Sequence, residues 1–234
     1  MTSRHPLTGD NSPALESAAL EPTAPEEDAY VLPPPGAAAV FGPVLDGAGA
    51  FARILATRGV EQGLIGPHEV PRLWDRHLLN CAVVAELIGD RCETLVDIGS
   101  GAGLPGIVLA MVRPEIDVTL LEPMERRCRF LSECVAELGL ANASVLRGRA
   151  EDVVLQADVA TARAVAPLDR LAELAISMVR PGGMVLAIKG QAAGDELKKA
   201  RPVLRRIGAR SAEVVHAGQG KVIPATTVVR FFAS

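Results

Sequence analysis

The spacing of hydrophobic residues divides the chain into three regions, and the first has no regular pattern. Residues 1–35 contain seven prolines and six acidic residues but few large apolar side chains. Such a segment cannot bury enough apolar surface to offset the conformational entropy that ordering costs. This composition predicts a disordered leader over residues 1–35.

The second region has apolar residues at helical spacing. They recur in this way from Val40 to Leu55, and a second amphipathic run extends from near His68 to Ile88. A glycine follows each run closely, as is common where helices end. These two helices predict an N-terminal helical cap over residues 36–92.

From residue 93 onward, strand and helix patterns alternate. The predicted strands lie at residues 95–98, 118–121, around 145, 158–163, 184–189, 213–216 and 226–232. The predicted helices lie at residues 107–112, 124–138, 167–179 and 194–204, with a turn at residues 181–183. Alternation followed by a closing strand pair indicates a mostly parallel seven-stranded sheet with helices on both faces, forming one domain over residues 93–234.

The first of these strands ends in a glycine-rich loop, Gly99-Ser-Gly-Ala-Gly-Leu-Pro-Gly106, and a helix follows at once. Glycine permits positive φ and lets a ligand approach the backbone without meeting a Cβ. The start of the helix leaves backbone N–H groups free to bind an anionic group. The stretch therefore predicts a cofactor cradle.

Two cofactors fit the loop. Gly101-x-Gly103-x-x-Gly106 matches the dinucleotide fingerprint, with Glu122 about 20 residues further on as the ribose-binding acid. The alternative register, Asp97-x-Gly99-x-Gly101-x-Gly103, is the first motif of Rossmann-like S-adenosylmethionine (SAM) methyltransferases. Asp97 suits the cationic methionine end of SAM and fits poorly beside a pyrophosphate. The residues favour SAM over NAD, and both remain open.

Charge is distributed unevenly along the chain. The net charge is −4, but residues 1–40 hold six acids and one base, which leaves 22 acids and 23 bases in the rest. For any single arginine a solvated helix face is the simpler interpretation, but the arginines as a group suggest an RNA-facing surface. The group comprises Arg126, Arg127 and Arg129 with Arg147 and Arg149, then Arg53, Arg58, Arg72 and Arg76 of the predicted cap, and Arg201, Arg205, Arg206 and Arg210 late in the chain.

Other functional classes lack support in the sequence. No apolar run approaches the roughly 18 residues of a membrane span, and no signal-peptide pattern is present. The four cysteines form no CxxC pair, which indicates reduced core thiols in a cytosolic protein rather than a metal site. We therefore expect neither a membrane nor a metal partner.

Four motifs together resemble one known family. They are Arg76-His-Leu-Leu79, Val96-Asp-Ile-Gly-Ser-Gly-Ala-Gly-Leu-Pro-Gly-Ile107, Ala162-Arg-Ala164 and Lys189-Gly-Gln191. Many methyltransferases share the alternating glycines, whereas the Gly-Leu-Pro-Gly ending and the Lys-Gly pair are typical of the 16S ribosomal RNA guanine-N7 methyltransferases (RsmG, also called GidB). The resemblance covers about residues 40–233.

The resemblance implies SAM as cofactor and a guanine in the decoding region of 16S ribosomal RNA as substrate, either naked or in the small ribosomal subunit. We expect a cytoplasmic monomer. The expected cofactor contacts, with those of the loop itself, are Asp97, Gly99, Gly101, Gly103, Leu104, Glu122, Ala150, Glu151 and Arg163. The expected RNA contacts are Arg76, His77, Arg126, Arg127, Arg129 and Lys189.

Arg163 is the expected catalytic residue, because it ends the fourth predicted strand, where substrate and methyl donor meet in SAM enzymes. The Asn/Asp-Pro-Pro-Tyr motif of amine-methylating enzymes is absent there, which favours a ring nitrogen as acceptor. Such a nitrogen needs alignment but no general base. The alternatives are a methyltransferase for a protein or small molecule, an NAD-binding oxidoreductase, and a non-catalytic RNA-binding module.

Overall fold

The computed structural model describes residues 31–234, so most of the predicted leader lies outside the described residues. Ordered packing is already present at Val31, within the last five residues of that leader. Its side chain is buried, and its carbonyl oxygen accepts a hydrogen bond of 2.8 Å from Trp74 Nε1. The globular body therefore includes at least part of the segment that the composition assigned to the leader.

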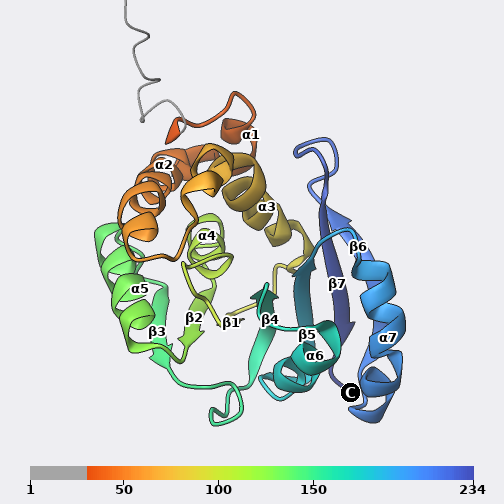
Figure 1. The fold of residues 1–234 in the computed structure, drawn as a ribbon. Helices are drawn as coiled ribbons and strands as arrows, with labels where there is room; N and C mark the ends of the chain where they lie inside the picture. The colour runs from red at the N-terminus through yellow and green to blue at the C-terminus, as the bar shows by residue number, and fades with distance from the viewer. Residues whose placement is uncertain (1–30) are drawn as a thin grey trace, which may run out of the picture.

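The body is built on one seven-stranded sheet with the order β3-β2-β1-β4-β5-β7-β6 (Figure 1). The strands are β1 (Thr94–Ile98), β2 (Asp117–Glu122), β3 (Ala143–Arg147), β4 (Ala157–Arg163), β5 (Val179–Lys189), β6 (Arg210–Ala217) and β7 (Thr226–Phe232). β1 to β5 pair in parallel, and β7 runs antiparallel to both β5 and β6. This confirms the predicted Rossmann-like fold.

Seven α-helices accompany the sheet in the described part of the chain. They are α1 (Ala37–Phe41), α2 (Leu45–Ile54), α3 (Leu79–Ala82), α4 (Gly106–Val112), α5 (Glu125–Glu137), α6 (Leu168–Ile176) and α7 (Ala193–Arg206). Short 3-10 and π-helical segments extend those of the cap: η2 (Gly42–Val44), η3 (Leu55–Gly59), η4 (Pro67–Arg72), η5 (Leu73–Leu78) and η6 (Val83–Leu87). The second cap helix is thus present but irregular.

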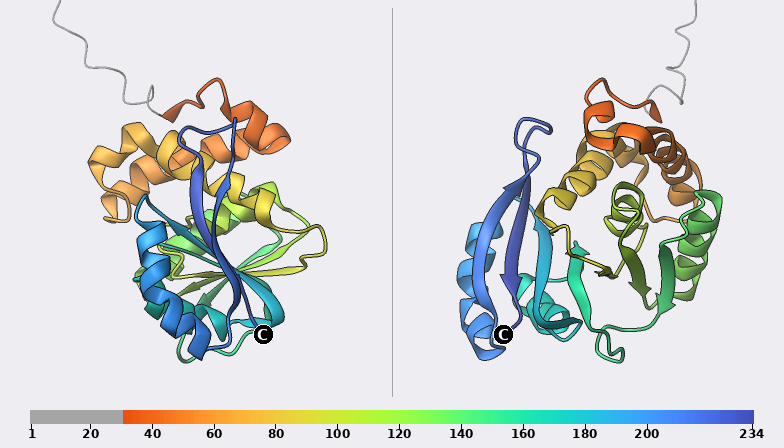
Figure 2. Two further views of the ribbon diagram at one scale, coloured as in Figure 1. Left: turned by 90° about the vertical axis from the view of Figure 1, so that its right-hand side faces the viewer. Right: turned by 180° about the vertical axis from the view of Figure 1, so that it is seen from behind.

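The helices cover both faces of the sheet (Figures 1 and 2). The cap, α4 and α5 share a core with Leu95 and Leu120, whereas α6 and α7 pack with Val96 and Leu121. Neighbouring residues of one strand point to opposite faces, which explains why both members of each pair are apolar. Because the cap shares its core with the sheet, it has no separate core of its own.

One predicted boundary is wrong. The helix expected over residues 167–179 ends at Ile176, and β5 begins at Val179, so the expected turn lies inside this strand. The pairing register shifts between Ala157 and Val159. A Cβ at Gly183 would lie 2.8 Å from the Val179 Cβ, so glycine is needed where the strand bends.

The helical run Ala37–Gly59 also departs from expectation. It spans 23 residues and is long and apolar enough, by length and composition alone, to cross a membrane. Polar residues such as Asp46 and Arg53 interrupt the run, so it contains no unbroken apolar stretch of that length. Phe51, Ala52 and Leu55 of this run are fully buried in the core. Packing against the rest of the protein therefore accounts for the apolar face.

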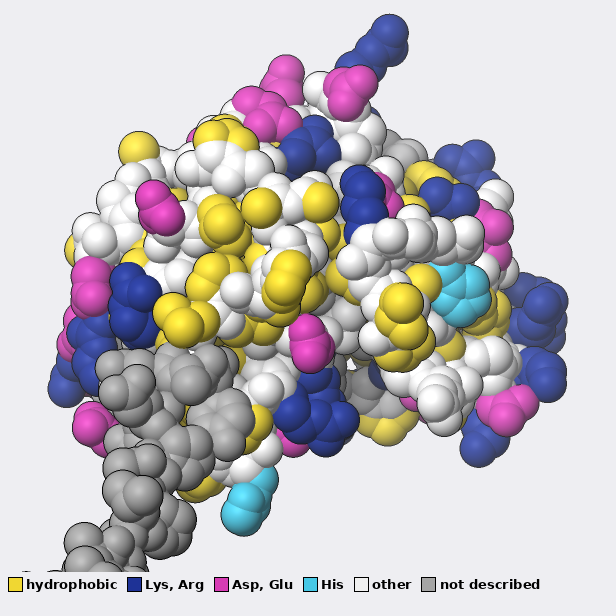
Figure 3. All heavy atoms as spheres, turned by 90° about the horizontal axis from the view of Figure 1, so that it is seen from above, with side chains coloured by type: hydrophobic (Ala, Val, Ile, Leu, Met, Phe, Trp, Pro, Cys, Tyr) yellow, Lys and Arg dark blue, Asp and Glu magenta, His cyan; other side chains and the backbone are white. Residues whose placement is uncertain are grey.

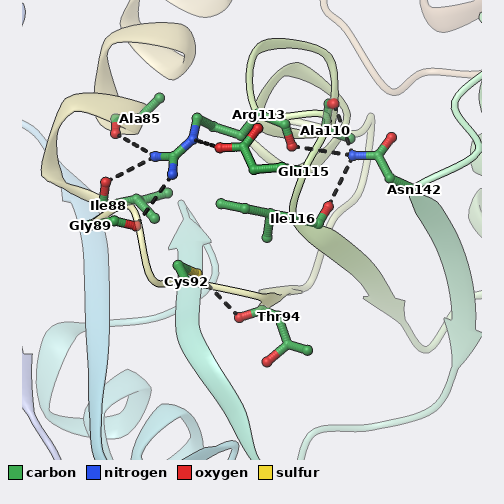
Figure 4. Close-up of polar contacts among 10 residues, drawn as sticks. All are labelled: Ala85, Ile88, Gly89, Cys92, Thr94, Ala110, Arg113, Glu115, Ile116 and Asn142. Carbon is green, nitrogen blue, oxygen red and sulfur yellow. Dashed lines mark hydrogen bonds and ion pairs between the residues drawn. The ribbon is translucent and has the colours of Figure 1, made fainter.

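Arg113 joins the end of α4 to the end of the cap (Figure 4). Its guanidinium donates to the carbonyl oxygens of Ala85 (3.2 Å), Ile88 (2.9 Å) and Gly89 (3.3 Å), and it also pairs with Glu115. The last carbonyls of a helix have no partner within the helix, and a guanidinium satisfies several at once. Arg113 thereby fixes the cap to the turn before β2.

Asn142 holds the same turn from the β3 side (Figure 4). Its Nδ2 donates to the carbonyl oxygens of Ala110 (3.1 Å), Arg113 (3.3 Å) and Ile116 (2.9 Å). One side chain thus ties the loop after α5 to both α4 and the start of β2.

A buried carboxylate connects β1 to the helix that follows it. Asp97 Oδ2 accepts from the Gly106 backbone N–H (3.0 Å), and Oδ1 accepts from Thr161 Oγ1 on β4 (3.1 Å). Ser100 Oγ donates to the Asp97 carbonyl oxygen (2.9 Å). Burial raises the pKa of Asp97 to about 7, even though these hydrogen bonds oppose the shift.

Gly106 allows α4 to approach the sheet closely. A Cβ at this position would lie 2.7 Å from Asp97 Oδ2 and would overlap the Leu120 side chain, which belongs to the buried face of β2. Any larger residue must therefore push the helix away from the carboxylate that caps it.

We expect Gly106→Ala to lower the free energy of unfolding by about 1–3 kcal/mol, the usual cost of overpacking a core. Gly194→Ala is the matched control, because a Cβ at Gly194, in α7, meets nothing within 4 Å. Urea unfolding followed by circular dichroism measures both. Equal midpoints for the two variants would contradict the close approach.

Asp97 should also shape the dependence of stability on pH. The unfolded carboxyl loses its proton near pH 3.8, the ordinary pKa of an aspartate, whereas the folded one keeps it to about pH 7. The contribution of Asp97 to stability therefore falls as pH rises from about 4 to 7. In Asp97→Asn the free energy of unfolding should no longer fall between about pH 4 and 7 through this group. In Asp90→Asn, at an exposed site, the fall should be the same as in wild type. Parallel stability curves for wild type and Asp97→Asn would refute the assignment.

Candidate active site

A cavity of about 550 Å³ lies at the carboxyl ends of the central strands. It is lined by Ile98, Gly99, Leu121, Glu122, Pro123, Met124, Arg127, Gly148, Arg149, Ala150, Glu151, Arg163, Ala164, Val165, Ala166, Pro167, Arg170 and Leu174. β1 lies between β2 and β4 in the sheet, so the chain order reverses here. Ligands of open α/β sheets bind at such a reversal. We call this space the cofactor cavity.

Five of the predicted cofactor contacts line this cavity: Gly99, Glu122, Ala150, Glu151 and Arg163. They come from the ends of β1, β2 and β4 and from the segment that follows β3. The parallel strands bring them together, as the strand pattern predicted.

The structure does not place the other four, Asp97, Gly101, Gly103 and Leu104, on the cavity wall. Asp97 is committed to the hydrogen bonds described above. Gly101 has φ +56°, and a Cβ there would contact only the Gly99 carbonyl oxygen at 3.7 Å, so its conformation rather than its size requires glycine.

Glu122 holds the loop from the cavity side. Its side chain is buried, with Oε2 accepting from the Gly101 N–H (3.0 Å) and Oε1 from the Met124 N–H (3.0 Å). A carboxylate has about four lone-pair sites. Glu122 can therefore accept two further hydrogen bonds from a ligand such as the hydroxyls of a ribose.

The arginine cluster of α5 is divided between two environments. Arg127 is half-buried on the cofactor cavity, with NH1 3.8 Å from Glu122 Oε2. Its Nε is buried and, among the described residues, has no hydrogen-bond partner. Arg126 and Arg129 are exposed and line a different, smaller cavity. An unsatisfied buried donor is costly, and this one belongs to a side chain on the wall of the cofactor cavity.

The apolar part of the wall was not among the predicted site residues. Met124 and Val165 are 41% and 37% exposed, which is high for large hydrophobic residues. Both follow strand ends, and Val165 lies close enough to Gly99 that a Cβ there would be 3.0 Å from it. Apolar residues directly after predicted strands were the available signal. They suit a flat, weakly polar group such as a nucleobase.

Arg163 reaches from the end of β4 to the cap. Its NH2 lies 2.6 Å from His77 Nδ1 and 3.2 Å from the Arg76 carbonyl oxygen, and its NH1 lies 3.5 Å from Cys81 Sγ. Three of the five guanidinium N–H groups are thus used within the described residues. The structure thus brings Arg163, predicted as the catalytic and cofactor-binding residue, into contact with His77 and the Arg76 backbone, both predicted to contact RNA.

His77 is neutral in this arrangement. Burial, followed by the positive charge of Arg163, lowers the pKa of His77 to about 4, and a hydrogen bond to Glu69 only partly opposes this. The Nε2 atom lies 2.9 Å from Glu69 Oε2, so it carries the proton and Nδ1 accepts from Arg163. Glu69 was not among the predicted site residues.

A second cavity, of about 510 Å³, shares Arg163 and Ala164 with the cofactor cavity. Lys189, predicted to contact RNA, lies on its wall but is only 9% exposed. Its Nζ pairs with Glu196 Oε2 (2.8 Å) and donates to the Ala166 carbonyl oxygen (2.9 Å). Lys189 therefore holds the loop after β4 in place and does not present a free charge.

The surface seen from the cap side shows basic and acidic side chains interspersed rather than one continuous basic face (Figure 3). Over residues 31–234, no group of three or more His, Cys, Asp or Glu side chains is arranged to hold a metal ion. The four cysteines are buried free thiols.

Comparison with solved structures identifies the fold. A SAM-dependent methyltransferase from Aquifex aeolicus is 20% identical, with a TM-score of 0.53 over 73% of this chain and 100% of that one. A SAM-dependent O-methyltransferase from Thermotoga maritima is 15% identical, with a TM-score of 0.51 over 65% of this chain and 64% of that one. At such identities the likeness concerns the fold alone.

Comparison with known sequences is more specific. The family described as "rRNA small subunit methyltransferase G" (GidB) matches residues 46–223. Proteins named ribosomal RNA small subunit methyltransferase G are 55% identical in Thermobifida fusca, over 86% of this chain and 85% of that protein, and 51% identical in Streptomyces avermitilis, over 92% and 88%. The chain belongs to the rRNA small subunit methyltransferase G family.

Proposed function

We propose that this protein transfers a methyl group from SAM to N7 of a guanine in the decoding region of 16S ribosomal RNA. The proposal is based on the position of Arg163, which lies on a wall shared by the cofactor cavity and the second cavity. The chain also belongs to a family of rRNA methyltransferases. Methyl transfer requires donor and acceptor to meet, and two adjoining cavities provide such a place.

The residues of the cofactor cavity fit SAM. Glu122 has acceptor capacity for the ribose hydroxyls, and the half-buried guanidinium of Arg127 lies on the same wall. Val165 and Met124 provide apolar surface for the adenine. When bound, SAM supplies an electrophilic methyl group on a sulfonium. The protein binds and orients both reactants.

A ring nitrogen such as guanine N7 is a suitable methyl acceptor next to Arg163, because its methylation needs no general base. Its lone pair attacks directly, so no proton needs to be removed and alignment is the main requirement. His77, the histidine nearest to Arg163, has both ring nitrogens engaged in hydrogen bonds and is not available as a base. Arg163 retains two N–H groups for a carboxylate, a phosphate or the guanine edge.

The proposal includes 16S ribosomal RNA, naked or within the small subunit, as the partner, and the bacterial cytoplasm as the location. The proposal keeps the expected monomer, and the residues that line the cofactor cavity all belong to one chain. Mass spectrometry of 16S ribosomal RNA nucleosides from a deletion strain provides the direct test. We expect one 7-methylguanosine to be lost and then restored by purified protein with SAM. Unchanged 7-methylguanosine would favour a protein or small-molecule substrate.

We expect Arg163→Ala to keep the fold but lower turnover roughly 100-fold, the scale of about 1 Å of misalignment. Arg163→Lys should restore little, because one ammonium cannot reach the His77 ring, the Arg76 carbonyl and a ligand at once. Single-turnover methylation of the RNA measures both. Near-normal turnover in the alanine variant would remove Arg163 from the site.

The divided arginine cluster gives a second prediction. Reversing the charges of Arg126 and Arg129 should weaken RNA binding, flatten its salt dependence and leave SAM affinity unchanged. Arg127→Ala should instead lower SAM affinity, because Arg127 lines the cofactor cavity. The same reversal at Lys198 and Lys199, exposed on α7, is the matched control. Equal RNA affinity in the Arg126/Arg129 variant and the control would make the α5 arginines an ordinary solvated face.

A further inference from the structure

We propose that Glu69 and His77 are positioning residues that hold the Arg163 guanidinium between the cofactor cavity and the second cavity. This inference rests on the proposed function and assigns to two cap residues a part in it. The chain of contacts runs from Glu69 Oε2 to His77 Nε2 (2.9 Å) and from His77 Nδ1 to Arg163 NH2 (2.6 Å).

The contacts require one arrangement of protons. An arginine guanidinium can only donate, so His77 Nδ1 must accept and the remaining ring proton must lie on Nε2. Glu69 accepts that proton and so selects the tautomer, as a carboxylate partner does for other functional histidines. His77 is only 12% exposed, which shields both hydrogen bonds from competing water.

The contacts that orient the Arg163 guanidinium come from the cap rather than from the sheet. Arg163 is the last residue of β4 that pairs with β5, and it precedes an exposed segment at Ala164 and Val165. The strand fixes its backbone but not the far end of its long side chain. The Arg76 carbonyl (3.2 Å) and Cys81 Sγ (3.5 Å) provide the other contacts, and all come from the cap. The cap therefore sets where the guanidinium points, although it contributes no strand to the sheet.

Two amide substitutions test the two hydrogen bonds of His77 separately. In His77→Asn, the side-chain oxygen lies near the former position of Nδ1 and can still accept from Arg163, but the link to Glu69 is lost. In His77→Gln, the longer side chain reaches toward Glu69 and vacates the Nδ1 position. We expect His77→Gln to lower the single-turnover rate roughly 10–100-fold and His77→Asn to retain most of it.

Glu69 gives a parallel pair. Glu69→Gln keeps an oxygen that accepts from Nε2 and should retain most activity. In Glu69→Ala nothing holds the ring proton on Nε2, so His77 can change tautomer and the methylation rate should fall. His68→Asn and His68→Gln, at an exposed histidine in the same 3-10 helix, are the matched controls and should match wild type. Thermal unfolding of every variant verifies that it is folded.

A double-mutant cycle distinguishes positioning from general support of the fold. If His77 acts through Arg163, His77→Gln should lower the rate less than about 2-fold further in the Arg163→Ala background, because residues in one network are not additive. Full additivity, or equal losses in His77→Asn and His77→Gln, would overturn the inference.

A readout independent of substrate keeps this inference separate from the proposed function. The guanidinium ¹⁵N signals of Arg163 should show restricted rotation in wild type and His77→Asn and averaged rotation in His77→Gln. Averaged signals in wild type would overturn the positioning role. A wild-type protein with restricted signals but no 7-methylguanosine product would instead overturn the proposed function.

Discussion

The buried carboxylate of Asp97 is the interaction on which the rest of the site depends. It accepts from the first turn of α4 and from Thr161 on β4, and so joins the two strands at the centre of the sheet to the helix that follows the glycine loop. The close approach of α4 at Gly106 makes this contact possible. Removal of the carboxylate from water is costly, and its raised pKa reflects that cost.

A second buried carboxylate, Glu122, binds the glycine loop from the other side. Asp97 faces inward and binds α4, whereas Glu122 faces the cofactor cavity and binds the outer side of the same loop through the Gly101 N–H. The loop is therefore held between two acids from adjacent strands. This arrangement holds the loop in place before a ligand binds, which lowers the entropic cost of binding.

The cap completes the site from the other side. Arg113 and the shared hydrophobic core fix it to the sheet, and Glu69, His77 and the Arg76 carbonyl then meet Arg163. Residues separated by more than 80 positions thus form one line of hydrogen bonds. The irregular helices of the cap thereby bring Glu69, His77 and the Arg76 carbonyl to the end of β4.

The sequence by itself determined the seven strands, the switch from period two to helical spacing, and the glycine loop, because these are local patterns of apolar residues and backbone freedom. It also placed Gly99, Glu122, Ala150, Glu151 and Arg163 at strand ends, and parallel strands necessarily bring such residues to one edge. Tertiary structure decided the direction of each side chain. It turned Asp97 inward, paired Lys189 with Glu196, separated Arg127 from Arg126 and Arg129, and supplied Glu69. These outcomes depend on contacts between elements far apart in the chain, and no local spacing encodes the partner that a charged side chain finds.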